Sequence, residues 1–428
     1  MKVKRLKMQS FRGIGDLTLE FDVSEPIVFI GINGVGKSSI LDALSLLLSR
    51  FMEWIGGVSP KDEVRAFSEL DISNKDILTR LNITILLGGG EEYWEISRNR
   101  NGVAEDSMHE MIRAASNAIW RHWQNEPQYN LPLAVYYPVN RAVIDISLEI
   151  PNKTQFKQID AYEKALTGSI NDFAIFFQWF RNREDLESEL LRDNRAYQDS
   201  QLEAVRQATS SLIPSFSKLR VRRSPLRMTV IKYDQELIIN QLSDGEKCLL
   251  AMVGDLARRL AIANPSLPDP LQGSGVVLID EIELHLHPKW QREIIPALTR
   301  TFPNCQFIVT THSPQVISQV KPEGIYILEK TDEGVVAKKP ESSFGRDSNR
   351  ILEDLMDVPA RPQEIKESLL ELFRLIDAGN LEGARQLRQQ LANEIGADEP
   401  AKKAAAETTI EKLALNISKL QNMRRLAI

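Results

Sequence analysis

A glycine-rich stretch carries the residues whose chemistry is most readily inferred. Residues 31–38, Gly-Ile-Asn-Gly-Val-Gly-Lys-Ser, fit the pattern G-x-x-x-x-G-K-[ST] and follow an apolar run at Ile27–Ile30. In such a loop, backbone N–H groups surround the β-phosphate of a nucleotide, and the N-terminus of the next helix adds partial positive charge. Lys37 should bridge the β- and γ-phosphates, and Ser38 should bind Mg²⁺. The sequence therefore predicts a nucleoside triphosphate site contacted by Asn33, Gly34, Val35, Gly36, Lys37, Ser38 and Ser39.

Two carboxylates and a histidine follow at the ends of two predicted strands. Asp280 and Glu281 end the apolar run Val276–Ile279, which is typical of a strand buried on both faces. Because ligands gather at the carboxyl ends of parallel strands, we expect Asp280 to hold the metal and Glu281 to deprotonate the attacking water. His312 ends the next strand and is predicted to hydrogen-bond the γ-phosphate, although by itself it would also fit a half-buried structural imidazole.

A helix start lies between these two groups of residues. Ser243 with Glu246 three residues later predicts a capping box that opens a helix running to about Ala263. The segment Leu-Ser-Asp-Gly-Glu-Lys at 242–247 also resembles the signature of ABC ATPases. With GINGVGKS, VVLIDE and TTHSP in the same order, the sequence resembles the ABC-type heads of the SMC and RecF class over nearly all of residues 1–340.

This resemblance implies both a fold and an assembly. The implied fold is α/β, a P-loop NTPase of the ABC ATPase head type, with a mixed sheet, an antiparallel β lobe, a helical insertion and a C-terminal helical tail. In that family, ATP is held between two heads, so a homodimer or a higher homo-oligomer is expected. Ser243, Gly245 and Glu246 would then act on the ATP held by a second copy, with ATP and Mg²⁺ as the bound groups.

Several weaker positions remain open at this point. Arg12 matches a phosphate-facing arginine of related heads, and any exposed arginine would look the same. The glutamine loop of the family is not evident, with Gln155 and Gln158 as candidates. His285 and His287 could ligate a metal, but no third ligand is visible nearby in the sequence, and by resemblance this segment is the D-loop.

The elements that position these residues divide into four predicted regions. Residues 1–105 form an N-terminal ATPase lobe of strands around a helix at Lys37–Trp54, and residues 106–217 form a mainly helical insertion. In the insertion, aromatic residues near 173–180 favour helix–helix packing over base stacking. Residues 218–345 form the C-terminal ATPase lobe. Residues 346–428 form a helical tail with two helices joined at Asp377–Asn380 and apolar stripes that would pack on the head, dock a partner or mediate self-assembly.

Composition limits the class of protein. The chain has 428 residues, 2 cysteines and a net charge of −6, without an apolar run long enough to span a membrane or a secretory signal, so a cytoplasmic location is expected. These features argue against a membrane transporter. The net negative charge also argues against a protein that binds nucleic acid over most of its surface. The stretch from Lys218 to Lys232 is basic, and its alternation predicts one charged strand face, solvated or in contact with DNA.

The tail narrows the functional prediction by resemblance. Residues 344–362 and the helical hairpin after them resemble the tail of the ATPase subunit of Septu anti-phage systems, which works with a separate HNH endonuclease. The resemblance therefore implies an ATPase that regulates a nuclease partner. The residues after His312 lack an acidic D-x-D motif at a strand end, so no nuclease centre is expected in this chain. Two alternatives stay open, a RecF-like DNA repair ATPase that binds duplex DNA directly and a nucleotide-gated scaffold without hydrolysis. The phage trigger, the stoichiometry and the direction of ATP control do not follow from the sequence.

Overall fold

The computed structural model describes residues 1–56, 67–100, 109–126, 128–139, 141, 156–167, 173–332, 334–359 and 361–395. The chain divides into two compact units, Met1–Met356 and Asp357–Ile428. No helix in these described ranges is long and apolar enough to cross a membrane.

A mixed sheet lies at the centre of the first unit. Among the described residues it has six strands in the order β13-β12-β3-β11-β10-β6. Neighbours from β12 to β6 run parallel, and β13 pairs antiparallel with β12. The inner strands are buried on both faces because helices cover them, which explains their continuous apolar runs. The bounds are β3 Ile27–Ile30, β6 Leu133–Tyr137, β10 Gly275–Ile279, β11 Cys305–Thr310, β12 Ile325–Thr331 and β13 Gly334–Lys338.

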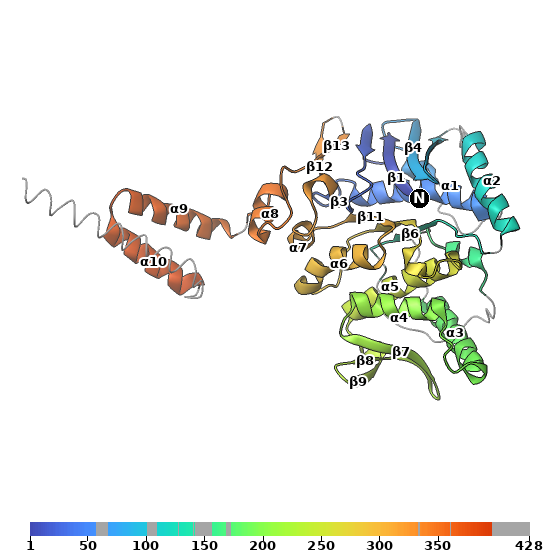
Figure 1. Ribbon diagram of the computed structural model, residues 1–428. Coiled ribbons are helices and arrows are strands. Elements are labelled where there is room, and N and C mark those ends of the chain that lie inside the picture. The colour runs from blue at the N-terminus through green and yellow to red at the C-terminus, as the bar shows by residue number, and fades with distance from the viewer. Residues whose placement is uncertain are drawn as a thin grey trace, which may run out of the picture. The chain divides into compact units, whose positions relative to one another are not determined.

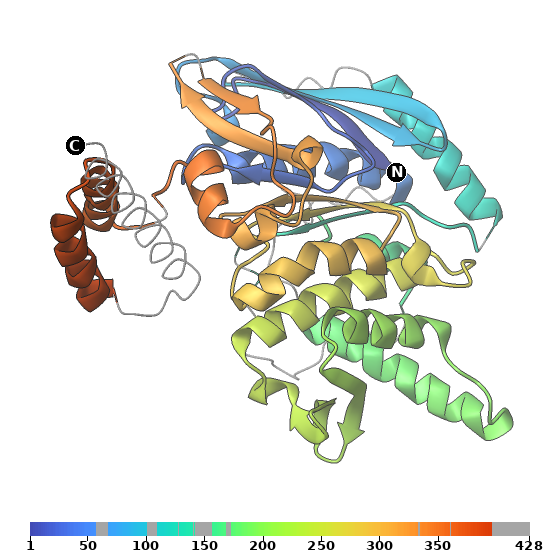
Figure 2. The same ribbon diagram turned by 60° about the vertical axis from the view of Figure 1, so that its left-hand side comes forward.

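An antiparallel sheet forms the predicted β lobe beside this core (Figure 1). Its order is β2 (Leu17–Glu20), β1 (Lys2–Gln9), β4 (Leu78–Leu87) and β5 (Gly90–Asn99). Helix α1 (Lys37–Gly56) lies between the two sheets, and α2 (His109–Asn125) packs along it (Figure 2). Trp94 of β5 donates from its indole nitrogen to the Leu47 carbonyl at 3.1 Å and stacks on Phe51, with ring centroids 5.6 Å apart.

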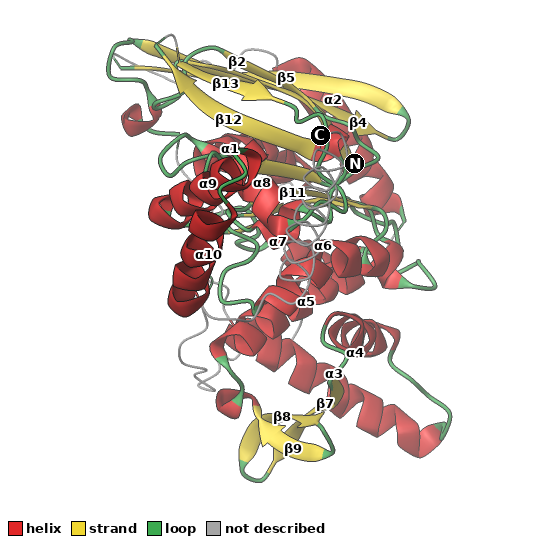
Figure 3. Cartoon of the chain, turned by 90° about the vertical axis from the view of Figure 1, so that its left-hand side faces the viewer, coloured by secondary structure: helices red, strands yellow, loops and turns green. Residues whose placement is uncertain are grey.

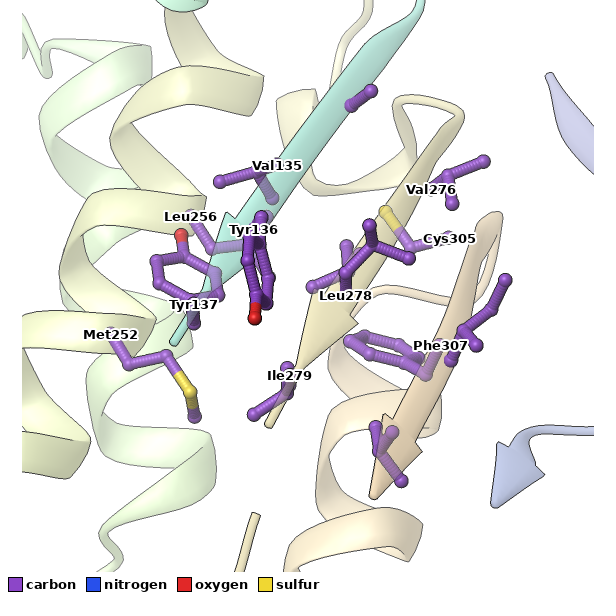
Figure 4. Packing of buried hydrophobic residues seen from close by; sticks show 14 of the residues in the cluster. Val135, Tyr136, Tyr137, Met252, Leu256, Val276, Leu278, Ile279, Cys305 and Phe307 are labelled. Carbon is purple, nitrogen blue, oxygen red and sulfur yellow. The ribbon is translucent and has the colours of Figure 1, made fainter. Parts of the chain in front are cut away.

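Helices cover the opposite face of the central sheet. Helix α5 (Asp244–Ala263) packs on β6, α6 (Pro288–Thr301) lies beside it, and α3 (Phe173–Asp193) and α4 (Ser200–Leu212) form the next layer (Figure 1). Met252 and Leu256 of α5 face Tyr137 of β6 (Figure 4). The aromatic residues of α3 are buried in this layer, which confirms the helix-packing interpretation; they are Phe173, Phe176, Phe177, Trp179 and Phe180.

A small antiparallel sheet lies at the far end of the first unit from the β lobe (Figure 3). It consists of β7 (Phe216–Arg223), β8 (Leu226–Lys232) and β9 (Gln235–Ile238). As predicted for the basic stretch, Leu219 and Val221 of β7 are buried while Lys218 is exposed. The remaining elements of this unit are short: α7 Pro314–Ile317, α8 Ser348–Leu355, η1 Glu69–Asp71, η2 Gln158–Tyr162, η3 Ile239–Gln241, η4 Pro270–Gln272 and η5 Pro322–Gly324.

The second unit contains the helical hairpin that the tail sequence predicts. Helix α9 spans Gln363–Asp377 and α10 spans Leu381–Ile395. Their facing sides share an apolar cluster built from Ile365, Leu372, Ile376, Ala384 and Leu391. One stripe of each predicted helix is therefore buried within the hairpin itself.

Candidate functional site

The glycine-rich loop joins β3 to α1 at the carboxyl edge of the central sheet. Gly31, Gly34 and Gly36 have φ values of 147°, 78° and 113°, which side chains other than glycine rarely adopt. At Gly31 a Cβ atom would lie 2.6 Å from the Leu328 carbonyl oxygen, so β12 also excludes a side chain there. The Lys37 ammonium donates to the carbonyl oxygens of Gly31 at 2.9 Å and Ile32 at 3.1 Å and curls back over the loop.

Three carboxylates act on the Lys37 ammonium. This side chain is buried, with 6% of its surface exposed. Burial lowers the pKa of Lys37 below its ordinary value, and Asp280, Glu281 and Glu283 oppose that shift. The acids at the end of β10 are therefore near enough to the lysine for their charges to matter. This is the juxtaposition that the parallel arrangement of β3, β11 and β10 predicts.

Thr310 links the two acids that end β10. Its hydroxyl donates to Asp280 Oδ1 at 2.5 Å and accepts the Glu281 backbone N–H at 2.7 Å. Glu281 has φ of 46°, in the left-handed region, and its carboxylate belongs to a residue that is only partly buried. The Asp280 residue is buried, with 3% of its surface exposed. One hydroxyl therefore fixes a buried carboxylate and the backbone of the adjacent, more accessible acid.

The segment that contains His312 is held by Glu283. The Glu283 carboxylate accepts the His312 backbone N–H at 2.5 Å and the Thr311 hydroxyl at 2.7 Å. The contact with Glu283 uses the His312 backbone, and the His312 imidazole takes no part in it. His312 follows β11 at the same edge of the central sheet as Asp280. The sequence alone does not predict these roles of Glu283 and Thr310. Their one signal is their position in the chain, two residues from Glu281 and from His312 respectively.

The predicted signature helix begins as its capping box requires. The Ser243 hydroxyl accepts the Glu246 backbone N–H at 3.4 Å, and Glu246 accepts the Ser243 backbone N–H at 3.1 Å. Lys232 pairs with Glu246 at 2.6 Å, which ties β8 to this helix start. At Gly245 a Cβ atom would lie 2.2 Å from the His285 carbonyl oxygen. The signature helix thus begins in direct backbone contact with the D-loop segment, and Ser243 remains exposed.

Arg12 lies between α1 and the β lobe and is committed to acidic partners. Its guanidinium contacts Asp42 at 2.6 Å and Asp71 at 3.0 Å, and it donates to the Ser39 hydroxyl at 3.4 Å. Burial lowers the pKa of Arg12, but Asp42 and Asp71 outweigh it and raise the pKa above its ordinary value. The contact with Ser39 places Arg12 beside α1, the helix that follows the glycine-rich loop. A phosphate-binding role for Arg12 stays a prediction.

Other candidates lie away from this edge. Gln158 donates its amide to the carbonyl oxygens of Tyr129 at 2.6 Å and Ala263 at 2.8 Å, near the amino end of β6. It is therefore wrong as a glutamine-loop candidate, because the nucleotide edge is at the carboxyl end of that strand. Gln155 lies outside the described residues. His287 accepts the Lys289 backbone N–H at 3.3 Å as the cap of α6, and the described chain holds no group of three or more His, Cys, Asp or Glu residues suited to a metal.

The basic strand β7 is matched by carboxylates. Arg220 and Arg222 pair with Glu236 at 3.2 Å and 2.7 Å, and Arg223 pairs with Glu184 at 3.1 Å. Much of the positive charge that suggested a DNA contact is thus neutralised within the chain. The alternation of the strand was predicted, but these acidic partners come from α3 and β9 and could not be inferred from the strand itself.

Comparisons with known proteins agree with the motifs. A family model described as an AAA domain matches residues 5–214, and a second AAA domain model, whose description also names the AbiEii toxin of a type IV TA system, matches residues 147–318. The retron Ec83 probable ATPase of Escherichia coli is 30% identical over 98% of this chain and 87% of its own length. The Septu protein PtuA of Bacillus thuringiensis is 22% identical over 89% of this chain and 90% of its own length.

Among solved structures, the Smc head domain bound to the C-terminal domain of ScpA, derived from Pyrococcus furiosus, is 16% identical with a TM-score of 0.47 and covers 79% of this chain and 96% of that one. The retron relative meets the chain over almost its full length, through the ATPase lobes and the tail. The chain belongs to the family of the retron Ec83 probable ATPase and is related to the Septu protein PtuA.

Proposed function

We propose that this chain binds ATP with Mg²⁺ at the loop of residues 31–38 and hydrolyses it to ADP and phosphate. The observation that supports this most directly is the meeting of Lys37, Asp280, Glu281 and His312 at one edge of the central sheet. These residues come from the ends of three neighbouring parallel strands. A glycine loop, a buried lysine and two acids at one edge provide the positioning and charge that phosphoryl transfer requires.

The residues of the site fit ATP and Mg²⁺ by their chemistry. The left-handed glycines leave backbone N–H groups near the start of α1 free of side-chain obstruction, which suits an anion. Within the described ranges, the Lys37 ammonium bonds only neutral carbonyl oxygens of its own loop, so a phosphate would be a stronger acceptor. Ser38 and Asp280 offer hard oxygen ligands that would hold Mg²⁺, which neutralises phosphate charge when bound.

Glu281 is the residue we assign to water activation. Its carboxylate would take the proton of a water whose oxygen attacks the γ-phosphorus as the bond to the β-γ bridging oxygen breaks. Asp280, buried and hydrogen-bonded to Thr310, is better suited to hold the metal than to move a proton. The His312 imidazole would donate to the γ-phosphate, with its backbone fixed by Glu283.

We further propose that two copies close around ATP and that the assembly controls a nuclease partner in anti-phage defence. Ser243 is exposed at the N-terminus of a helix of 20 residues, so this helix end is accessible to a nucleotide held by another copy. The relatives named as retron and Septu proteins support the defence role. A separate HNH endonuclease is the partner that this role implies.

The alternative of direct duplex DNA binding, as in a RecF-like repair ATPase, has less support. The arginines of β7 that suggested it are paired with Glu236, Glu184 and Asp185. Salt-sensitive binding of duplex DNA by the chain alone would favour that alternative. Co-purification of an HNH protein from the native host would favour the defence role.

The test of the ATPase proposal is a pair of substitutions at the nucleotide edge. Glu281→Gln keeps the shape of the side chain but removes the base, so ATP turnover should fall by about 10²–10⁴-fold with ATP affinity preserved. Lys37→Ala should instead abolish ATP binding in calorimetry, because the loop loses its bridging cation. Phosphate release measures turnover. Undiminished release by Glu281→Gln would assign the water to another group, and unchanged ATP affinity of Lys37→Ala would remove the loop assignment.

A further inference from the structure

An arginine that follows β6 reaches the acids at the end of β10. Strand β6 runs parallel to β10, with Tyr137 opposite Ile279, so the chain after β6 emerges at the nucleotide edge. Arg141 is the fourth residue after the strand and is buried, with 2% of its surface exposed. The sequence alone does not predict a role for Arg141, because no motif includes it.

The Arg141 guanidinium bonds backbone oxygens of both acids. One terminal nitrogen donates to the carbonyl oxygens of Asp280 and, at 3.1 Å, of Pro138. The other donates to the carbonyl oxygen of Glu281 at 2.6 Å. Its planar fork therefore bridges two consecutive peptide groups, a geometry that the single ammonium of a lysine does not reproduce.

These bonds hold Glu281 in a backbone conformation that is uncommon for a residue with a side chain. Glu281 has φ of 46°, which costs free energy in a residue with a side chain and persists only where its surroundings enforce it. Thr310 holds the Glu281 N–H, and Arg141 holds the Glu281 carbonyl oxygen. The residue is thus fixed from both sides, and the direction of its carboxylate follows from the direction of its backbone.

A purely structural arginine would be expected to have a carboxylate partner. A buried guanidinium is costly to desolvate unless it is paired. Within the described residues, no carboxylate oxygen lies within ion-pair distance of Arg141, and its acceptors are backbone carbonyl oxygens. The Arg141 guanidinium therefore orients the peptide groups of Asp280 and Glu281, at the acidic edge of the central sheet.

A second contact connects this arginine with the signature helix. Burial raises the pKa of the Cys248 thiol in α5, and the charge of Arg141 opposes that shift. Cys248 lies one turn after Ser243, which caps the helix. Arg141 consequently bonds the backbone of the acids that follow β10 and lies near the helix whose N-terminus would meet a second copy.

We propose that Arg141 is a positioning residue for ATP hydrolysis that holds Glu281 in the orientation required to activate water. The proposal rests on the proposed function of Glu281. It separates the role of Arg141 from nucleotide binding, because its bonds reach the acids of β10 and not the glycine loop.

The first experiment compares kcat with KM and ATP affinity in the full-length chain. Arg141→Lys keeps the charge but loses the fork, so kcat should fall by about 10–100-fold while KM and the ATP dissociation constant change less than about threefold. A change confined to KM, or an unaltered kcat, would overturn the proposal. Arg223→Lys, at an exposed pair in β7, is the matched control and should leave both constants unchanged.

The second experiment tests whether Arg141 acts through Glu281. In the Glu281→Gln background, adding Arg141→Lys should lower kcat little further, because the two residues act as one unit. A full multiplicative loss would show an independent role and overturn the proposal. If Glu281→Gln alone left turnover unchanged, the ATPase assignment of Glu281 would fail instead, so the two failures are distinguishable.

A third measurement keeps the proposal falsifiable if Arg141→Lys is poorly folded. Arg141→Ala is assayed for phosphate release with and without about 20 mM guanidinium chloride, far below denaturing concentrations. Partial recovery of kcat with guanidinium, but not with the same concentration of sodium chloride, is expected. Absence of recovery in a variant that still binds ATP would overturn the proposal.

Discussion

Thr310 shows how one side chain sets the geometry of the two acids. Its hydroxyl donates to the Asp280 carboxylate and accepts the Glu281 N–H. Strand register explains this, since Ile279 of β10 lies opposite Val309 of β11 and the next residues are Asp280 and Thr310. A hydroxyl is needed here because it acts as donor and acceptor at once.

Thr310→Val should reduce ATP turnover while leaving ATP binding intact. Valine keeps the shape but leaves the Glu281 N–H unpaired, at a cost of about 1–3 kcal/mol, which corresponds to about 5–150-fold in rate if the cost falls on the catalytic conformation. Phosphate release and calorimetry measure the two effects. Thr79→Val, at a buried threonine of β4 that donates to the Gln9 carbonyl, is the control. Equal turnover in both variants would show that Thr310 does not set the acids.

At the scale of single residues, the sequence predicts the reactive side chains better than the residues that hold them in place. Lys37, Asp280, Glu281 and His312 follow from motif spacing, because loops after parallel strands meet at one edge. Thr310, Glu283 and Arg141 do not, because each contact depends on the register of β6, β10 and β11. A hydrogen bond between residues 29 to 140 positions apart leaves no periodic signal in one sequence.

At the scale of elements, the start of α5 is fitted against the D-loop. The His285 carbonyl oxygen occupies the space that a Cβ of Gly245 would need. His285 itself has φ of 63°, so the D-loop backbone turns toward the helix at this point. The glycine of the signature therefore has a packing reason within a single copy, in addition to any role toward a second one.

Gly245→Ala should destabilise the chain by about 1–3 kcal/mol through overpacking, because the obstructing atom belongs to the backbone and cannot rotate away. Gly90→Ala is the control, since its Cβ would meet the Leu87 carbonyl oxygen at an ordinary 3.8 Å. Urea unfolding compares the two free energies of unfolding. Equal values would mean that the helix start and the D-loop separate without cost.

A buried ionic cluster anchors the middle of α5 to β6. Asp255 contacts Arg258 at 2.8 Å and Arg259 at 2.7 Å and accepts the Tyr137 hydroxyl at 3.1 Å. Burial by itself would raise the pKa of Asp255, but the two arginines outweigh it and lower the pKa to about 2. Helix periodicity predicts α5, and both arginines lie on the same helix as Asp255, but the contact with Tyr137 depends on how α5 packs on β6.

Asp255→Asn should lower the free energy of unfolding at pH 7 by about 3–5 kcal/mol, because it leaves buried arginines without their counter-ion. The folded pKa lies below the ordinary value of 3.8, so the carboxylate stabilises the fold above about pH 4 and loses this effect as the pH falls toward about 2. Urea unfolding at pH 7 and pH 3 should show the difference shrinking. Asp185→Asn, at an exposed pair, should cost at most about 1 kcal/mol.

At the scale of the whole molecule, the order of the motifs predicts the central sheet and its antiparallel neighbour, and the apolar stripes predict the α9–α10 hairpin. The sequence predicts strands in the region of β7, β8 and β9, but it does not predict the bond between Lys232 at the end of β8 and Glu246 at the start of α5. Such a bond can be inferred only from the positions of both elements in the structure.

Ser243→Arg should prevent ATP-dependent dimerisation while preserving ATP affinity. In the Glu281→Gln background, light scattering should show dimers with ATP, and adding Ser243→Arg should return monomers, because the larger side chain blocks the exposed helix end. Ser243→Ala, which loses only the cap at about 1 kcal/mol, should still dimerise. Persistent dimers in Ser243→Arg would place the contact between copies elsewhere.

The close approach of α3 to α5 has a mechanical consequence. At Gly254 a Cβ atom would lie 2.9 Å from the Phe176 ring, so the outer end of this ring lies close against the backbone of α5. Helices α3 and α5 are therefore in direct contact at this point, and densely packed interiors transmit strain. We therefore expect a displacement of α3 to displace α5, the helix that Ser243 caps.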